Sequence, residues 1–149
     1  MSGLIEDGRA SFAGDQSELT ERVIGVFFRV ANELGFGFNE AVYRRAMCVA
    51  LRRSGLVIEE ELAIPVWFWG ENVGTFYADI VVAGVLVLEW KVSEQITKAN
   101  EAQSLHYLRA STMEVGLVMT FGEVPKFRRV VMANMRKRSR FPGKEFPNK

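Results

Sequence analysis

Two carboxylates and a lysine lie near the middle of the chain in a pattern that suits metal chemistry. Glu89 and Lys91 end the apolar run of residues 85–88, and Asp79 lies ten positions earlier, after another apolar stretch. Side chains two apart on a strand share one face, so Glu89 and Lys91 project together while Trp90 points to the other side. Charged groups at the end of a buried strand are costly unless they are paired or used. We therefore expect a functional site at this strand end.

Asp79 belongs to the strand that precedes Glu89. A tight connection at Ala83-Gly84 predicts a hairpin that places Glu89 opposite Ala78. Asp79 would then lie within one register step of Glu89, and a β-bulge would bring the two carboxylates fully into line.

Two close carboxylates suit a hard divalent cation such as Mg²⁺ or Mn²⁺, which prefers oxygen ligands and keeps several waters. Such an ion lowers the pKa of a bound water and stabilises charge on a phosphoryl oxygen. Lys91 could orient or help deprotonate that water, or neutralise the developing charge. Two carboxylates with a bound metal ion and a nearby lysine are the minimal set of groups for hydrolysing a phosphodiester. The simpler alternative is a salt bridge between an acid and Lys91 at the strand end.

Three further polar residues have spacing that fits the same site. Gln103 and Tyr107 are four apart on a predicted helix and therefore share a face. Glu40 lies in the first turn of another predicted helix, three residues before Tyr43. The simpler alternatives are a favourable charge at a helix N-terminus for Glu40 and a place in the core for the two tyrosines.

Apolar periodicity predicts the elements that must position these residues. Period-2 and period-3.6 patterns indicate three helices and five strands, with Asn39 and Thr97 as helix N-caps. The expected packing is an α/β fold in which a central sheet is flanked by helices. The predicted helices cover residues 19–34, 40–53 and 98–110, and the predicted strands cover residues 62–69, 73–82, 85–92, 115–121 and 127–132.

The second helix carries both an apolar stripe and four arginines. Its expected buried face consists of Val42, Ala46, Val49 and Ala50, so that the arginines, including Arg44, mostly face elsewhere.

The length of 149 residues fits one domain, which we place at residues 18–134, after a leader of residues 1–17 and before a basic tail of residues 135–149. Nine basic residues and one acid lie in residues 126–149, although the whole chain has a net charge of +1. A basic end on an acidic body can attract polyanions, although a solvated tail would look the same.

The cysteine content and the length of the apolar runs bear on the cellular compartment. Cys48 is the single cysteine, so no intrachain disulfide can form. The apolar runs are too short to span a bilayer, and residues 1–16 lack an apolar run of signal-peptide length. These features predict a cytoplasmic protein without a membrane partner.

The motifs also resemble a known family. Gly37-x-x-Glu40-x-x-Tyr43 is the signature of the GxxExxY protein family, which is placed in the PD-(D/E)XK nuclease superfamily. The resemblance covers residues 19–131, and the motifs follow in the family's order: Leu-Thr-Glu at 19–21, Glu33-Leu34-Gly35, the signature, Tyr77-Ala78-Asp79, Glu89-Trp90-Lys91, Ala102-Gln103 and Tyr107-Leu108.

The resemblance implies a fold and a set of roles. The fold would be a restriction-endonuclease-like core with a mixed central sheet. Asp79 and Glu89 would be the metal carboxylates and Lys91 the catalytic lysine. Gln103 and Tyr107 would form a Gln-x-x-x-Tyr helix motif, and Glu40 would be an additional helix-borne acid.

The chain departs from the family at three positions. Ala31 and Asn100 stand where members often carry histidines, and Trp90 stands where an aliphatic residue is usual. The single histidine, His106, is therefore expected to be partly exposed rather than catalytic.

Together these observations predict a nuclease that depends on Mg²⁺ or Mn²⁺ and acts on DNA. Two alternatives on the same fold stay open: a catalytically inactive nucleic-acid-binding module, and a protein-interaction domain that uses Trp67, Phe68 and Trp69. The small size leaves a homodimer or a protein partner open as well.

Overall fold

Two helices open the part of the chain that the computed structural model describes, residues 16–137. Helix α1 covers Ser17–Leu34 and helix α2 covers Glu40–Arg53. Between them, Gly35 and Gly37 have φ values of 74° and 113°, which an L side chain rarely adopts. The Asn39 side chain accepts a hydrogen bond from the Val42 amide at 3.1 Å, so it caps α2 as the sequence predicts.

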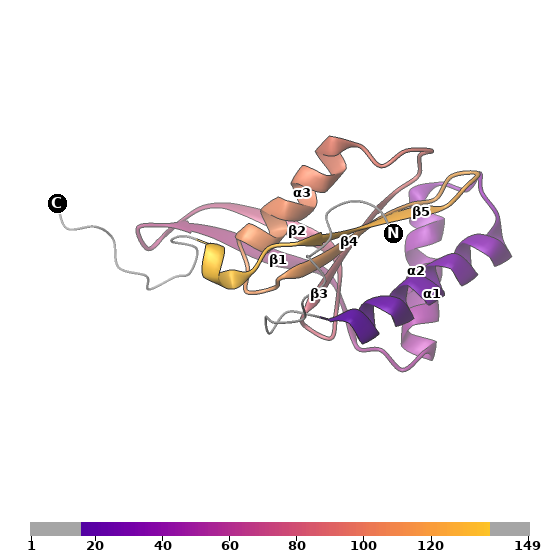
Figure 1. The fold of residues 1–149 in the computed structure, drawn as a ribbon, viewed down its shortest axis with the longest axis horizontal. Helices are drawn as coiled ribbons and strands as arrows, with labels where there is room; N and C mark the ends of the chain where they lie inside the picture. Colours follow the sequence, from indigo (N-terminus) through magenta and orange to yellow (C-terminus); the bar gives the residue numbers. More distant parts are fainter. Residues whose placement is uncertain (1–15, 138–149) are drawn as a thin grey trace.

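The remaining elements form a sheet with one crossover helix (Figure 1). The sheet order is β1-β2-β3-β4-β5, and every neighbouring pair is antiparallel except β3 and β4, which are parallel. Helix α3 provides the crossover that a parallel pair requires. The bounds are β1 Ile58–Phe68, β2 Glu71–Val82, β3 Leu86–Lys91, α3 Lys98–Arg109, β4 Val115–Thr120, β5 Lys126–Val131 and the short 3₁₀ helix η1 Asn134–Arg136.

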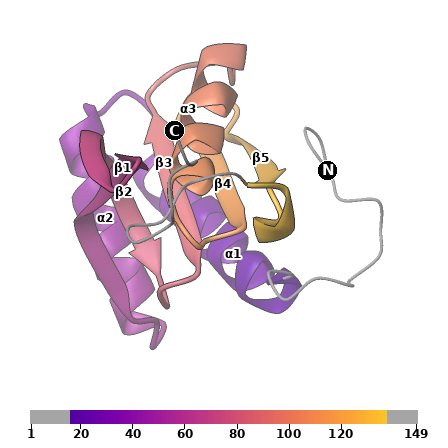
Figure 2. The same ribbon diagram turned by 90° about the vertical axis from the view of Figure 1, so that its left-hand side faces the viewer.

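Helices cover both faces of this sheet, which confirms the predicted α/β fold with a mixed central sheet (Figures 1 and 2). One core cluster joins α1 and α2 to strand residues that include Ile80, Leu88 and Trp90, and Leu117 of β4. The other cluster joins α3, through Tyr107 and Leu108, to Val81 and Val87. Alternation along β3 and β4 therefore separates an α1–α2 face from an α3 face, whereas in β2 the alternation breaks between Ile80 and Ala78.

The sheet forks between β2 and β3. These strands pair only from Val82↔Leu86 to Ile80↔Leu88. Beyond Leu88, β3 continues beside β4 to Lys91↔Thr120, whereas β2 stays with β1 as far as the Phe68↔Glu71 pair. Figure 1 shows the resulting β1–β2 hairpin extending beyond the other strands. The fork begins at the level of Asp79 and Glu89.

The predicted register of the β2–β3 hairpin was wrong by one residue. The connection contains Ala83, Gly84 and Val85, because Val82 pairs directly with Leu86. Ala83 and Gly84 adopt φ values of 54° and 71°, and the Val85 amide donates to the Val82 carbonyl at 3.0 Å. This paired register ends at Ile80↔Leu88, one position short of Asp79 and Glu89, because the two strands separate there.

The buried face predicted for α2 was only partly right, because Ala46 and Ala50 pack against the core but are not its main residues. Tyr43, Met47 and Leu51 face the core, whereas Val49 is 52% exposed. The three large side chains follow at intervals of four and bury more apolar area than the alanines beside them. Tyr43 stacks on Phe121 with ring centroids 4.2 Å apart.

The described residues extend slightly beyond the predicted domain limits. Ser17 already belongs to α1, and η1 includes Met135 and Arg136. Lys137 is buried, and its Nζ donates to the carbonyls of Ser111 and Met113 at 2.9 and 2.6 Å. The rest of the predicted leader and tail, residues 1–15 and 138–149, lies outside the described residues. No helix in the described range is long and apolar enough to cross a membrane.

Candidate metal centre

The fork brings the two predicted carboxylates together. Glu89 on β3 is odd-numbered like Val87, whose side chain packs on the α3 face. Asp79 on β2 lies where the alternation of that strand breaks, because Ile80 packs with α1 and α2 whereas Ala78 packs with α3. The charge of Asp79 acts on Glu89, so the two carboxylates are close across the fork. Lys91 follows two residues after Glu89 on the same strand face and is partly buried.

Glu89 is the most buried of these charged groups. Its side chain lies in the interior, 2% exposed, and its Oε1 has no hydrogen-bond partner among the described residues. Burial, followed by the charge of Asp79, raises the pKa of Glu89 to about 7. The charge of Lys91 opposes this pKa shift, and the charge of Glu40 adds to it. Asp79, Lys91 and Glu40 thus all lie close enough to act on one buried acid.

Asp79 has a partner that the sequence analysis missed. The Arg44 guanidinium donates from Nη2 to Asp79 Oδ1 at 2.6 Å and from Nη1 to the Asp79 carbonyl at 3.3 Å. Its Cζ lies 5.7 Å from the centroid of the Trp90 ring, within cation–π range. The expectation that the α2 arginines face away was therefore wrong for Arg44. Its position four residues after Glu40, on the same helix face, was the available signal.

Helix α3 borders the site through a short hydrogen-bond chain. Gln103 Nε2 donates to the Tyr107 hydroxyl at 2.9 Å, and that hydroxyl donates to the Tyr77 carbonyl on β2 at 3.1 Å. The pKa of Tyr107 is raised, first by burial and then by the charge of Glu89, while the bond from Gln103 works against the shift. Gln103 thus bonds to Tyr107, and Tyr107 lies close enough to Glu89 for the charge of that acid to act on it.

Two features of the sequence fix α3 at this place. Thr97 and Asn100 form a capping box, in which Thr97 Oγ1 accepts from the Asn100 amide at 3.1 Å and Asn100 Oδ1 accepts from the Thr97 amide at 3.0 Å. A Cβ on Gly116 of β4 would lie 2.7 Å from Ser104 Oγ, so glycine lets α3 approach the sheet closely.

Glu40 and His106 lie at the margin. Glu40 begins α2 and acts on Glu89 through its charge, yet no three His, Cys, Asp or Glu side chains in the described chain gather as one metal-binding group. His106 is exposed, as expected, and stacks on Phe76 with centroids 5.8 Å apart.

The residues present fit a divalent cation. Asp79 and Glu89 offer carboxylate oxygens from adjacent strands, and the buried Glu89 Oε1 lacks a hydrogen-bond partner within residues 16–137. A hard cation that keeps several waters needs no more than one or two protein carboxylates. Lys91 offers a nearby positive charge of the kind that phosphoryl chemistry uses.

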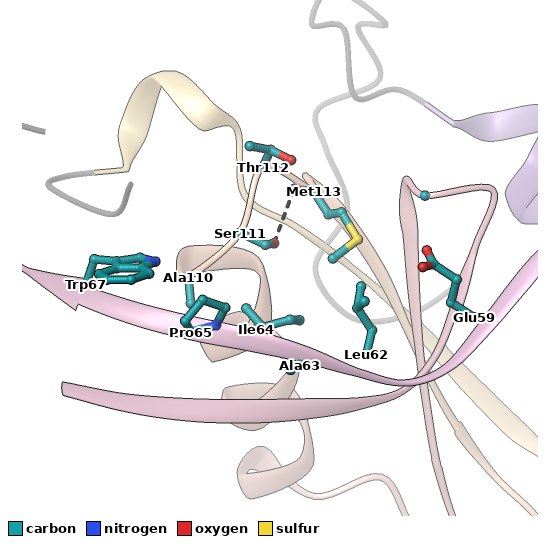
Figure 3. A pocket seen from close by; sticks show the side chains of 11 residues that line it. Glu59, Leu62, Ala63, Ile64, Pro65, Trp67, Ala110, Ser111, Thr112 and Met113 are labelled. Atoms are coloured by element: carbon teal, nitrogen blue, oxygen red, sulfur yellow. Dashed lines mark hydrogen bonds between the residues drawn. The ribbon is translucent and has the colours of Figure 1, made fainter. Parts of the chain in front are cut away.

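Two hollows lie away from this centre. One, of about 360 Å³, lies between β1 and the α3–β4 connection, where Pro65 and Trp67 face Ser111 and Met113 (Figure 3). The other, of about 660 Å³, lies between α1 and α2. Neither is lined by Asp79, Glu89 or Lys91.

A mixed sheet whose central strands carry an acid pair and a lysine defines a nuclease-like α/β domain. The family model described as the PD-(D/E)XK nuclease superfamily matches residues 17–130. This chain therefore belongs to the PD-(D/E)XK nuclease superfamily, whose nucleases generally use divalent metals. No curated protein and no solved structure matches the chain.

Proposed function

We propose that this protein is a divalent-metal-dependent nuclease that hydrolyses phosphodiester bonds in DNA. The observation that carries the proposal is Glu89, a buried acid whose Oε1 has no hydrogen-bond partner among the described residues, close to the charge of Asp79 and on one strand face with Lys91. Burying such a group without a partner costs roughly 1–3 kcal/mol, and more when the group is charged. A functional ligand explains why the fold keeps it.

Each residue has a role that follows from its place. Asp79 and Glu89 would hold Mg²⁺ or Mn²⁺, and Lys91 would orient the attacking water or neutralise charge on the phosphate. When bound, the ion supplies a more acidic water and stabilises negative charge on the phosphoryl oxygens. Tyr107, held by Gln103, ties α3 to β2 at the Tyr77 carbonyl and so keeps the α3 side of the site in place. Glu40 adds negative charge near Glu89.

A second candidate function rests on the tip of the β1–β2 hairpin. Phe68 and Trp69 are 53% and 43% exposed there, and their rings stack with centroids 4.9 Å apart. Exposed aromatics of this kind suit a binding surface, so an inactive nucleic-acid-binding or protein-interaction module is the alternative. Binding to DNA that weakens steeply with salt would favour phosphate contacts over a protein partner.

The direct test is cleavage of single-stranded DNA, double-stranded DNA and RNA with Mg²⁺, with Mn²⁺ and with a chelator. We expect metal-dependent cleavage that Asp79→Ala, Glu89→Ala and Lys91→Ala abolish. Calorimetry should show that the two carboxylate variants lose metal affinity, whereas Lys91→Ala keeps it and loses the chemical step.

A contaminating nuclease is the main danger in such an assay. Equal activity in the wild type and in all three folded variants would reveal a contaminant and defeat the enzyme proposal. Absence of both cleavage and metal binding in the wild type would favour the binding module.

A further inference from the structure

Arg44 is a cation inside a site that the proposed function gives to a metal ion. Its guanidinium contacts three groups at once: Asp79 Oδ1, the Asp79 carbonyl and the face of Trp90. The side chains of Arg44 and Asp79 are only 25% and 23% exposed. A guanidinium held from three directions in a half-buried place is ordered, unlike most surface arginines.

Arg44 and Glu89 approach Asp79 from different sides of the sheet. Arg44 comes from α2, whose neighbours Tyr43 and Met47 lie in the core cluster that contains Trp90. Glu89 points to the α3 face, toward Tyr107. Arg44 can reach Asp79 because β2 no longer pairs with β3 beyond Ile80 and Leu88. The guanidinium therefore engages Oδ1, and not Oδ2, from the α2 side.

We propose that Arg44 is a positioning residue, which fixes the Asp79 carboxylate so that Oδ2 and Glu89 together hold the metal ion. The inference rests on the proposed function, because it takes Asp79 and Glu89 as the metal ligands. Carboxylates that bind metals are themselves commonly held by a hydrogen-bond donor, and loss of that donor weakens metal binding. The contacts of Arg44 with the Asp79 carbonyl and with Trp90 do not compete with a cation at Oδ2.

The opposite effect is physically plausible, which makes the test decisive. A positive charge beside Asp79 also repels a metal ion, so an Arg44 that merely occupied the metal site would have to leave before the ion could bind. Removal of a competing arginine strengthens metal binding, whereas removal of a positioning arginine weakens it.

The experiment is calorimetric titration of the full chain with Mn²⁺, together with thermal unfolding in chelator to show that each variant is folded. We expect Arg44→Ala and Arg44→Gln to weaken Mn²⁺ binding roughly tenfold to a hundredfold. Arg44→Lys should recover only part of the affinity, because one ammonium cannot serve both Asp79 oxygens as a planar fork does. Arg45→Ala is the matched control: its side chain is the next on α2 and exposed, and its affinity should equal that of the wild type.

The outcomes separate this inference from the proposal on which it rests. Unchanged or tighter Mn²⁺ binding in Arg44→Ala and Arg44→Gln, with normal binding in the wild type, overturns the positioning role alone. A lower unfolding temperature with unaltered Mn²⁺ affinity also overturns it, because the role would then be structural. A wild type that binds no Mn²⁺ overturns the proposed metal centre and the positioning role together.

Discussion

At the scale of single residues, the site is organised around the cost of burying Glu89. A carboxylate that is buried close to Asp79, and whose Oε1 has no hydrogen-bond partner among the described residues, is more easily kept neutral than charged. Its pKa of about 7 means that near neutral pH the two forms have similar populations when no cation is bound. A cation between the carboxylates would favour the charged form, so metal binding should release protons and strengthen as pH rises.

The raised pKa of Glu89 predicts how stability depends on pH. The folded protein holds this proton up to about pH 7, whereas the unfolded chain releases it near its ordinary value of 4.5. The unfolded state therefore binds fewer protons between these values, and the contribution of Glu89 to stability falls as pH rises through that window. The contribution is fully present below about pH 4.5 and is lost above about pH 7.

Glu89→Gln removes this titration. The variant should gain stability relative to the wild type between pH 4.5 and pH 8, by up to roughly 3 kcal/mol. Denaturant unfolding in chelator at several pH values measures the difference. Glu71→Gln, at an exposed position on the hairpin, is the control and should show little change. A stability difference between Glu89→Gln and the wild type that stays constant with pH would contradict the assignment.

The sequence predicted some site residues better than others, for physical reasons. Glu89 and Lys91 stand out because an apolar strand ends abruptly in charge, and period-2 alternation places them on one face. Arg44 was missed because a helical arginine has an ordinary place in solvent. Its partner lies 35 positions away in sequence, and only the fork makes that contact possible.

At the scale of elements, the close approach of α3 to β4 sets the α3 side of the site. Ser104 is fully buried opposite Gly116, and this contact holds the helix that carries Gln103 and Tyr107. In Gly116→Ala the new Cβ would lie 2.7 Å from Ser104 Oγ, so either the helix or the serine must move. We expect a loss of roughly 1–3 kcal/mol in the free energy of unfolding, as for other overpacked sites.

A second substitution makes this prediction specific. Ser104→Ala removes the nearest atom, so the double variant should recover part of the stability that Gly116→Ala loses. Urea unfolding of the two single variants and the double variant gives the coupling between them. Strict additivity would mean that Ser104 Oγ is not what the new methyl group meets.

The order and type of the elements could be read from the sequence, but their exact packing could not. In the part of the chain that the structure describes, periodicity and caps located the three α-helices and the five strands to within a few residues, but not the 3₁₀ helix η1. The α2 stripe was misplaced because Val42, Ala46, Val49 and Ala50 share a face as regular as that of Tyr43, Met47 and Leu51. Packing against the sheet determines which of the two faces is buried, and the sequence of α2 alone does not show this. The register of the β2–β3 hairpin was predicted wrongly because the sequence Val82-Ala83-Gly84-Val85 is compatible with a turn of two residues and with a turn of three.

At the scale of the whole molecule, charge is concentrated near the C-terminal end of the chain. Residues 138–149 contain four basic residues, Arg138, Arg140, Lys144 and Lys149, and one acid, Glu145. Such a segment suits the phosphate backbone of DNA, whose affinity for cations depends steeply on salt. Lys137, in contrast, belongs to the folded domain, because it is buried and its Nζ donates to Ser111 and Met113.

This difference predicts that two truncations, only two residues apart, behave differently. Deletion of residues 138–149 should leave the unfolding transition unchanged and weaken DNA binding at low salt. The slope of log K against log salt should become shallower by up to roughly 3, because each lost phosphate contact contributes about 0.7–0.9. Deletion of residues 136–149 should weaken DNA binding as well, but it also leaves two carbonyls without their donor and should cost roughly 1–3 kcal/mol of stability. Fluorescence titrations with DNA in chelator measure binding without cleavage, and thermal unfolding measures stability. If the full chain and the chain that lacks residues 138–149 bind DNA equally well, the tail has no role in DNA binding. If the two truncated chains are equally stable, Lys137 does not anchor the domain.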